Sequence, residues 1–210
     1  MDTRSKLEEA KYFLDALVKT KDDPKLLYFN LSAFLSAWRS VLDVMLYDFA
    51  EHYSIGFTRQ DVITDQNFKA VAQALKHRDA LHFIDWWRKK QGKLKENPLW
   101  GKRILIVHRG YPTISSTHTF YVSGSGGTSI TTTQPPPHWI FPATSEPVEL
   151  VSGEVISPEI ISPTTQQPSS EIEVRFSDFP NIEVTDMCTQ AFHEMEKIVQ
   201  QAQAIFHVRL

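Results

Sequence analysis

The feature that most constrains the fold of this chain is the segment from 24 to 53, "PKLLYFNLSAFLSAWRSVLDVMLYDFAEHY". Apolar side chains recur there every three or four residues over a longer stretch than anywhere else, which predicts a long helix with a wide apolar face. That face consists of Leu27, Leu31, Phe34, Leu35, Trp38, Val41, Leu42, Met45, Leu46 and Phe49. The small residues Ser32, Ala33, Ser36, Ala37 and Ser40 lie among them and let another helix approach closely.

A shorter helical pattern precedes this segment, over residues 6–19. Its apolar positions are Leu7, Ala10, Phe13, Leu14 and Leu17. The sequence "KDDP" then interrupts the pattern before the long segment begins. We therefore expect two antiparallel helices joined by a short turn.

Three further helices are predicted before residue 111. A weak one runs from about Asp65 to Lys76, and a second covers "DALHFIDWWRKKQGKL", residues 79–94. The third covers "PLWGKRILIVHR", residues 98–109, because Asn97 is a suitable N-cap and Pro98 suits the first helical position. Its interior glycine and β-branched residues are poor helix formers, so a buried strand is the competing interpretation of this stretch.

The last segment is predicted to be helical again, with Asp178 and Pro180 near its start. An apolar stripe at helical spacing runs along it through Cys188, Phe192, Met195, Val199, Ala202 and Phe206. Between 111 and 170 serine, threonine, proline and glycine dominate, and "THTFYVSGSGGTSITTT" is typical of a hairpin. "PPPHWIFPATSEPVELVSGEVIS" is expected to hold more short strands.

The simplest organisation is a single domain over residues 1–210, mainly α. Its helical core would comprise residues 6–110 and 180–207, interrupted by a β-hairpin-rich insertion at about 111–176. A third interpretation of the chain is a structural helical protein whose β appendage docks another chain.

The composition restricts the function classes. Hydrophobic residues make up 41% of the chain, which is enough for a core, while the net charge of −3 excludes a general polycation. Cys188 is the only cysteine, so neither an intramolecular disulfide nor a cysteine-based zinc cluster is expected. The charged N-terminus lacks a signal-peptide core and no apolar run reaches the length of a bilayer, so we expect a cytoplasmic protein without a membrane association.

The stretch "GKRILIVHRG", residues 101–110, contains the side chains best suited to catalysis. Arg103 offers a permanent fork of donors that matches a phosphate, and His108 titrates near neutral pH. Together they are a minimum set for cleaving RNA without a metal, because a base activates the 2′-hydroxyl and a cation stabilises the developing charge. Five residues of helix rotate the chain by about 500°, which leaves the two side chains roughly 140° apart. A partner subunit would bring a second copy of each to one cleft.

The surroundings of this pair are strongly basic. Between 88 and 109 the cations are Arg88, Lys89, Lys90, Lys93, Lys95, Lys102, Arg103 and Arg109, against the single acid Glu96. Such a strip favours a nucleic-acid surface, and a solvated lysine-rich helix face is the plain alternative. Arg88, Lys89, Lys90, Lys102 and Arg109 are the candidate RNA-binding residues.

The assembled segments resemble the HEPN family of helical domains, which includes many prokaryotic toxin and defence ribonucleases. "KLEEAKYFLDAL" is similar to the first helix of the family and "LYFNLSAFLSAWRSVLDVML" to its second. "FIDWWRKKQGKLKENPLWGKRILIVHRG" is similar to the later helices and ends in the family's arginine, four to six residues, histidine motif. The likeness covers residues 6–53 and 80–110, and extends to the terminal helix from about 180.

This resemblance implies a bundle of four or five helices that forms a homodimer with a shared cleft. It also implies metal-independent RNA cleavage without a cofactor, with His108 transferring a proton and Arg103 holding the phosphate. The possible partners are RNA and an antitoxin or nucleotidyltransferase-like protein. Ile104 stands where the family often has a polar residue, and this difference favours the alternative of a non-catalytic module that binds RNA, a nucleotide or a protein. The remaining histidines lack metal-ligand spacing, so no metal site is predicted.

Overall fold

The computed structural model describes residues 2–58, 60–102, 114–122, 128–134, 169–176, 178–208 and 210. Its helices are α1 (Thr3–Lys19), α2 (Pro24–His52), α3 (Asp65–Ala74), α4 (Arg78–Lys95) and α6 (Val184–Phe206), and residues 98–102 are also helical. The strands are β1 (Ile114–Val122), β2 (Thr128–Gln134), β3 (Ser169–Phe176) and β4 (Phe179–Glu183). The chain forms two compact units, one of Met1–Ile114 with Val174–Leu210 and one of Ser115–Glu173. A mainly helical fold with a small sheet before the last helix is thus confirmed.

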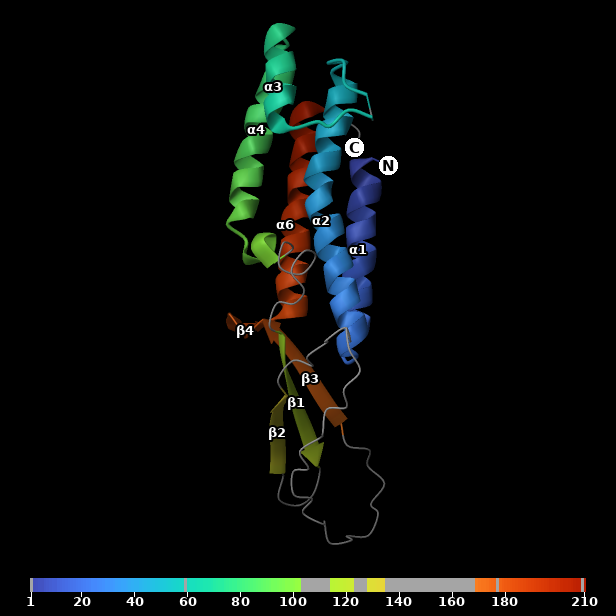
Figure 1. Ribbon diagram of the computed structural model, residues 1–210, viewed down its shortest axis with the longest axis vertical. Helices are drawn as coiled ribbons and strands as arrows, with labels where there is room; N and C mark the ends of the chain where they lie inside the picture. Colours follow the sequence, from blue (N-terminus) through green and yellow to red (C-terminus); the bar gives the residue numbers. More distant parts are fainter. Residues whose placement is uncertain are drawn as a thin grey trace, which may run out of the picture. The chain divides into compact units, whose positions relative to one another are not determined.

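The first unit is a bundle in which α2 and α6 run parallel to each other and antiparallel to α1 and α4 (Figure 1). The direction of α6 follows from its contacts with α2, since Trp38 reaches Ala191 and Phe49 reaches Phe206. The antiparallel course of α4 follows in the same way, because Trp86 reaches Phe206 and Lys90, later in α4, bonds to the earlier residue Gln201. Helix α3 packs on α4 at the end of the bundle where α2 finishes.

The predicted hairpin of the first two helices is confirmed. The Asp23 carboxylate caps α2 by accepting bonds from the N–H groups of Lys25 and Leu26, which leaves Pro24 at the first helical position. At the other end of the pair, the backbone N–H and hydroxyl of Thr3 both donate to Asp48, at 2.7 and 2.5 Å. These contacts fix how far α1 is displaced along α2.

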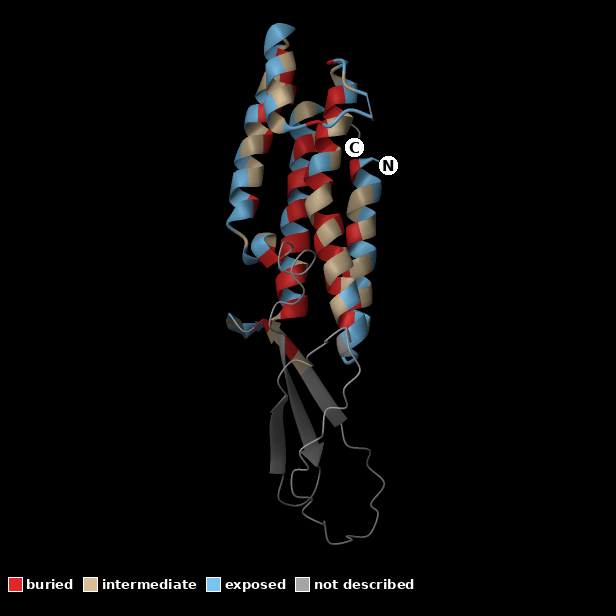
Figure 2. Ribbon diagram, in the orientation of Figure 1, coloured by how far each residue is buried: buried red, intermediate tan, exposed pale blue. Residues whose placement is uncertain are grey.

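Helix α2 is the centre of the core. All ten members of its predicted apolar face are buried, and Figure 2 shows α2, with buried stretches along its course, lying between α1 and α6. Two tryptophan indoles connect the helices through main-chain oxygens. Trp38 of α2 donates to Ala191 O of α6 at 2.9 Å, and Trp87 of α4 donates to Leu42 O of α2 at 3.1 Å.

The start of the terminal helix differs from the prediction. Residues 179–183 form strand β4, and α6 begins at Val184 rather than near Asp178 and Pro180. The reason is that β4 pairs with the end of β3, where Arg175 lies opposite Glu183 and its guanidinium donates to Pro180 O at 2.8 Å. From Val184 onward the predicted stripe is correct, since its members from Cys188 to Ala202 are buried and Phe206 is half-buried.

The predicted hairpin of the insertion is also confirmed. Strands β1 and β2 pair antiparallel with Ser116 opposite Gln134 and Val122 opposite Thr128, and the sheet order is β2-β1-β3-β4. The further strands expected between 135 and 168, like residues 103–109 of the predicted third helix, lie outside the described residues.

The packing of α2 is tested by shortening one side chain of its buried face. Leu35 is fully buried, so Leu35→Ala is expected to lower the free energy of unfolding by about 2–5 kcal/mol through lost burial and a residual cavity. Leu26→Ala is the matched control, because Leu26 lies on the same helix and is 45% exposed. Urea denaturation should leave this control within about 0.5 kcal/mol of the wild type. Equal losses in the two variants would contradict the assignment of the core face.

Candidate functional site

The helical turn at 98–102, which leads directly into Arg103, begins as the sequence predicts. The side-chain oxygen of Asn97 accepts a bond from Leu99 N at 3.0 Å, and its backbone oxygen accepts one from Trp100 N at 2.9 Å. This is an N-cap, which satisfies helix-end donors that lack an intrahelical partner. Leu99 is fully buried, so the turn is inserted into the core of the bundle. The motif residues Arg103 and His108, together with Ile104 and Arg109, lie outside the described residues.

Trp100 connects this turn to α2. Its ring lies edge-on to the Trp38 indole, with centroids 5.9 Å apart and planes at 75°, a favourable arrangement for two aromatic rings. The guanidinium of Arg39 lies over the Trp100 ring at 4.9 Å. This distance is within the range of a cation–π interaction.

Lys102 fixes the end of the same turn. Its ammonium lies 2.5 Å from a carboxylate oxygen of Asp178 and over the rings of Phe176 and Phe179, at 5.1 and 5.6 Å. Lys102 is buried, whereas the Asp178 side chain is 55% exposed. The group of Lys102, Asp178, Phe176 and Phe179 is called the lysine clasp below. It attaches the residue before Arg103 to the turn between β3 and β4.

The other predicted RNA-binding residues fall into two groups. Arg88 is engaged with α3, since its Nε lies 2.8 Å from an Asp65 carboxylate oxygen and its Nη2 donates to Asp65 O at 3.1 Å. Lys90 donates to Gln201 at 2.7 Å and lies over the Trp86 ring. By contrast, Lys89 is exposed and makes no ion pair with the described residues, although its charge is among those that lower the pKa of Asp85, after the larger effect of the hydrogen bond from Lys69. Lys93 and Lys95, at the end of α4, are also exposed and make no ion pair with these residues.

The structure adds two features to the site that the sequence analysis did not find. The first is the lysine clasp, which joins residues 76 positions apart in the chain and therefore has no local signal. The second is Arg39. The sequence does single out this residue, because it is the only charged residue between Lys25 and Asp43. A single charge in such a long uncharged stretch of helix is a reason to look for its function.

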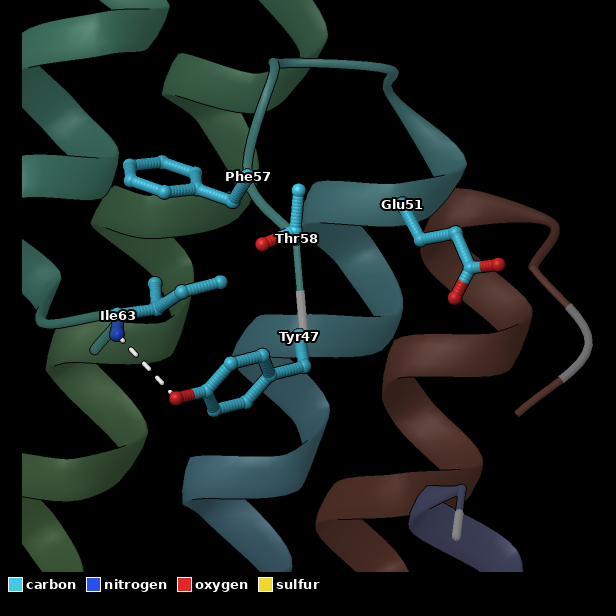
Figure 3. A pocket seen from close by; sticks show the side chains of 5 residues that line it. All are labelled: Tyr47, Glu51, Phe57, Thr58 and Ile63. Atoms are coloured by element: carbon cyan, nitrogen blue, oxygen red, sulfur yellow. Dashed lines mark hydrogen bonds between the residues drawn. The ribbon is translucent and has the colours of Figure 1, made fainter. Parts of the chain in front are cut away.

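A pocket of about 340 Å³ lies at the other end of α2, beneath the loop that leads to α3 (Figure 3). It is lined by Tyr47, Glu51, Phe57, Thr58 and Ile63. The Tyr47 hydroxyl donates to Asp61 O at 2.7 Å and accepts from Ile63 N at 3.3 Å, so it holds the loop. Tyr47 lies eight residues beyond Arg39, which is about 12 Å along the helix axis. The pocket is therefore separate from the turn at 98–102.

Two other chemistries find no support among the described residues. Burial raises the pKa of the Cys188 thiol, so this cysteine is not a thiolate nucleophile near neutral pH. In the described ranges no group of three or more histidine, cysteine, aspartate or glutamate side chains is arranged to hold a metal ion.

Of the helices that the structure describes, none is long and apolar enough to cross a membrane.

Comparison with known proteins gives no relative: no family model, no curated protein and no solved structure matches the chain. The resemblance to the HEPN family therefore remains a prediction from the residues quoted above.

Replacing either ionic partner of the lysine clasp is expected to lower stability by a different amount. Asp178→Asn leaves a buried ammonium without its carboxylate and is expected to lower the free energy of unfolding by about 1–3 kcal/mol. Lys102→Met leaves only a carboxylate that is already half in water, and the methionine still packs on the two phenylalanines. We expect it to cost roughly 1 kcal/mol or less.

Urea denaturation of both variants measures the difference. A larger loss for Lys102→Met than for Asp178→Asn, or no loss in either, would show that the ammonium and the carboxylate do not depend on each other.

Proposed function

We propose that the chain is a metal-independent RNA endonuclease of HEPN type, in which Arg103 and His108 of two protomers act in one cleft. The observation that carries this proposal is the anchoring of the turn that precedes Arg103. Asn97 caps this turn, Leu99 is buried in the core, and the lysine clasp holds its last residue. A catalytic group gains much of its effect from a fixed position, so a rigidly supported chain segment before the motif supports a catalytic role.

The electrostatics of α4 support an RNA substrate. Lys89, Lys93 and Lys95 are exposed near the C-terminal end of this helix, and between Lys89 and Lys95 the sequence has no acidic residue. Exposed lysines without carboxylate partners attract a phosphate backbone and release its counterions on binding. Arg88 and Lys102 contribute less to such a surface, because carboxylates already neutralise them.

The chemistry follows from the two motif side chains. His108 of one protomer removes the proton from a 2′-hydroxyl, and the oxygen attacks the adjacent phosphorus. Arg103 stabilises the additional negative charge on the phosphoryl oxygens. The bond from phosphorus to the 5′-oxygen breaks, and this oxygen leaves as a hydroxyl after receiving from the His108 imidazolium the proton that was taken from the 2′-hydroxyl. The products are a 2′,3′-cyclic phosphate and a 5′-hydroxyl end.

A second candidate is a non-catalytic HEPN-like module that binds RNA, a nucleotide or a protein such as an antitoxin or a nucleotidyltransferase-like partner. Ile104 favours it, because an apolar side chain directly after Arg103 supplies no polar group to the reacting phosphate. Binding of RNA without cleavage is the result that distinguishes this candidate from the first.

The decisive test is incubation of the purified protein with mixed single-stranded RNA in the presence of a chelator. The wild type is expected to produce cyclic-phosphate ends, and Arg103→Ala and His108→Ala to slow cleavage by about 100-fold or more. Arg4→Ala and His193→Ala are matched controls, since both side chains are exposed on other helices and should leave the rate unchanged. Cleavage by the wild type that equals cleavage by His108→Ala would remove the enzymatic proposal.

The shared cleft is tested by mixing two inactive variants. If each cleft combines Arg103 of one protomer with His108 of its partner, a mixed dimer of Arg103→Ala and His108→Ala has one intact site. Random pairing then restores roughly a quarter of the wild-type activity. An inactive mixture, after subunit exchange has been verified, would place both groups of each site in one protomer.

A further inference from the structure

Two side-chain hydrogen bonds join α4 to α6, which lie side by side in Figure 1. Lys90 donates from Nζ to Gln201 Oε1 at 2.7 Å, and Asn97, just past the end of α4, donates from Nδ2 to Glu194 Oε2 at 3.3 Å. The bonds are seven residues apart on both sides, in opposite chain directions, and so define the antiparallel register here. The surface strip that they enclose is called the α4–α6 seam, and its members are Lys90, Lys93, Asn97, Glu194, Lys197 and Gln201.

The middle of the seam carries one lysine from each helix. Lys93 lies one helical turn after Lys90. Lys197 lies three residues after Glu194 and four before Gln201. Residues three and four apart are neighbours on a helix surface, so both lysines are on the stripes that carry the cross-helix bonds. In the register of these bonds the two positions are displaced by a single residue, about 1.5 Å along the helix axis.

The seam brings these two positive charges together without a carboxylate between them. Lys93 and Lys197 are exposed, and neither makes an ion pair or a hydrogen bond with the residues that the structure describes. The acid of the seam, Glu194, already accepts the bond from Asn97. Because their stripes face each other, the two lysines repel, as like charges at neighbouring helix positions do. An anion within reach of both removes this repulsion and accepts a charge-assisted bond from each.

The other groups of the seam suit phosphate as that anion. Gln201 accepts the Lys90 bond through its oxygen, and its amide N–H groups have no acceptor within the described part of the chain. Lysine ammonium groups bind phosphates as point charges. Water screens exposed lysines, so they hold an isolated phosphate weakly, whereas a polyanion engages several at once and releases its counterions. A nucleic-acid strand therefore fits the seam better than a free nucleotide does.

We propose that Lys93 and Lys197 bind phosphates of a single RNA strand that lies along the α4–α6 seam. The inference rests on the proposed function for the identity of the ligand, which is RNA. It adds α6 to a basic surface that the sequence assigns to α4 and the residues after it. The contacts are made to the RNA backbone, so they position the strand and do not select its bases.

The test measures binding of a fluorescein-labelled 2′-O-methyl RNA, which lacks the attacking hydroxyl and is not cleaved. It is titrated with the wild type and with the double variant Lys93→Gln/Lys197→Gln at several salt concentrations. The double variant is expected to bind about 5- to 50-fold more weakly, and the slope of log K against log salt should fall by about one to one and a half. Lys93→Arg/Lys197→Arg keeps both charges and should keep the slope.

Lys19→Gln/Lys25→Gln is the matched control, because it removes two exposed lysines from α1 and α2 and changes the net charge by the same amount. This control is expected to bind as the wild type does. Thermal denaturation verifies that all variants are folded, which the exposure of the four lysines favours. Equal affinities of the seam variant and the control would overturn the inference.

Two competitors identify the ligand class. Adenosine monophosphate represents a free nucleotide, and a poly-glutamate peptide of the same charge as the RNA represents an acidic protein. Both are expected to displace the labelled RNA at least 10-fold less effectively than unlabelled RNA does. Displacement by either one as effective as that by RNA would overturn the assignment of the seam to a nucleic-acid strand.

The outcomes separate the inference from the proposed function. Wild type that binds RNA but does not cleave it, together with weaker binding by the seam variant, refutes the endonuclease and retains the seam as a phosphate-binding surface. Cleavage by the wild type with unaltered binding by the seam variant refutes only the inference. A protein that neither binds nor cleaves RNA refutes both.

Discussion

The bundle depends on two buried indole N–H groups, those of Trp38 and Trp87, and on the carbonyl oxygens that accept their bonds. The burial of apolar area is non-directional, whereas a buried N–H without a partner costs about 1–3 kcal/mol. Trp38 therefore fixes α6 against α2 through Ala191, and Trp87 fixes α4 against α2 through Leu42. Each bond is satisfied at one position along the helix axis. The three central helices thus obtain a defined register in addition to a hydrophobic core.

The position of the candidate site depends on the same helix register. Trp100 packs edge-on against Trp38, so the turn at 98–102 is placed by the same side chain that fixes α6. Arg39 follows Trp38 in the chain and its guanidinium lies 4.9 Å from the centre of the Trp100 ring, while Lys102 attaches the end of the turn to Asp178. Contacts from α2 and from the turn between β3 and β4 therefore converge on five residues of chain. The core and the turn that precedes Arg103 are connected through the aromatic pair of Trp38 and Trp100.

Much of this fold could be predicted from the sequence because helices leave a periodic signal. The ten apolar positions of α2, the cap at Asn97 and the stripe after Cys188 are local patterns, and the structure confirms them. The prediction of helix at 179–183 was wrong for a tertiary reason. Strand β4 forms because it pairs with β3, and the sequence of one strand does not indicate which strand it pairs with. For the same reason, the sequence shows the basic residues of this strip but does not show that Asp65 and Asp178 neutralise Arg88 and Lys102.

The distribution of carboxylate partners explains how an acidic chain could still present a surface to RNA. With a net charge of −3, long-range attraction to a polyanion is weak, and any affinity has to come from cations close to the strand. Carboxylates neutralise Arg88 and Lys102, and each of these two ion pairs joins separate secondary-structure elements. Lys89, Lys93 and Lys95 are exposed and make no ion pair with the residues that the structure describes. The cations that join parts of the fold, Arg88 and Lys102, are therefore different residues from the exposed lysines that the proposed RNA surface requires.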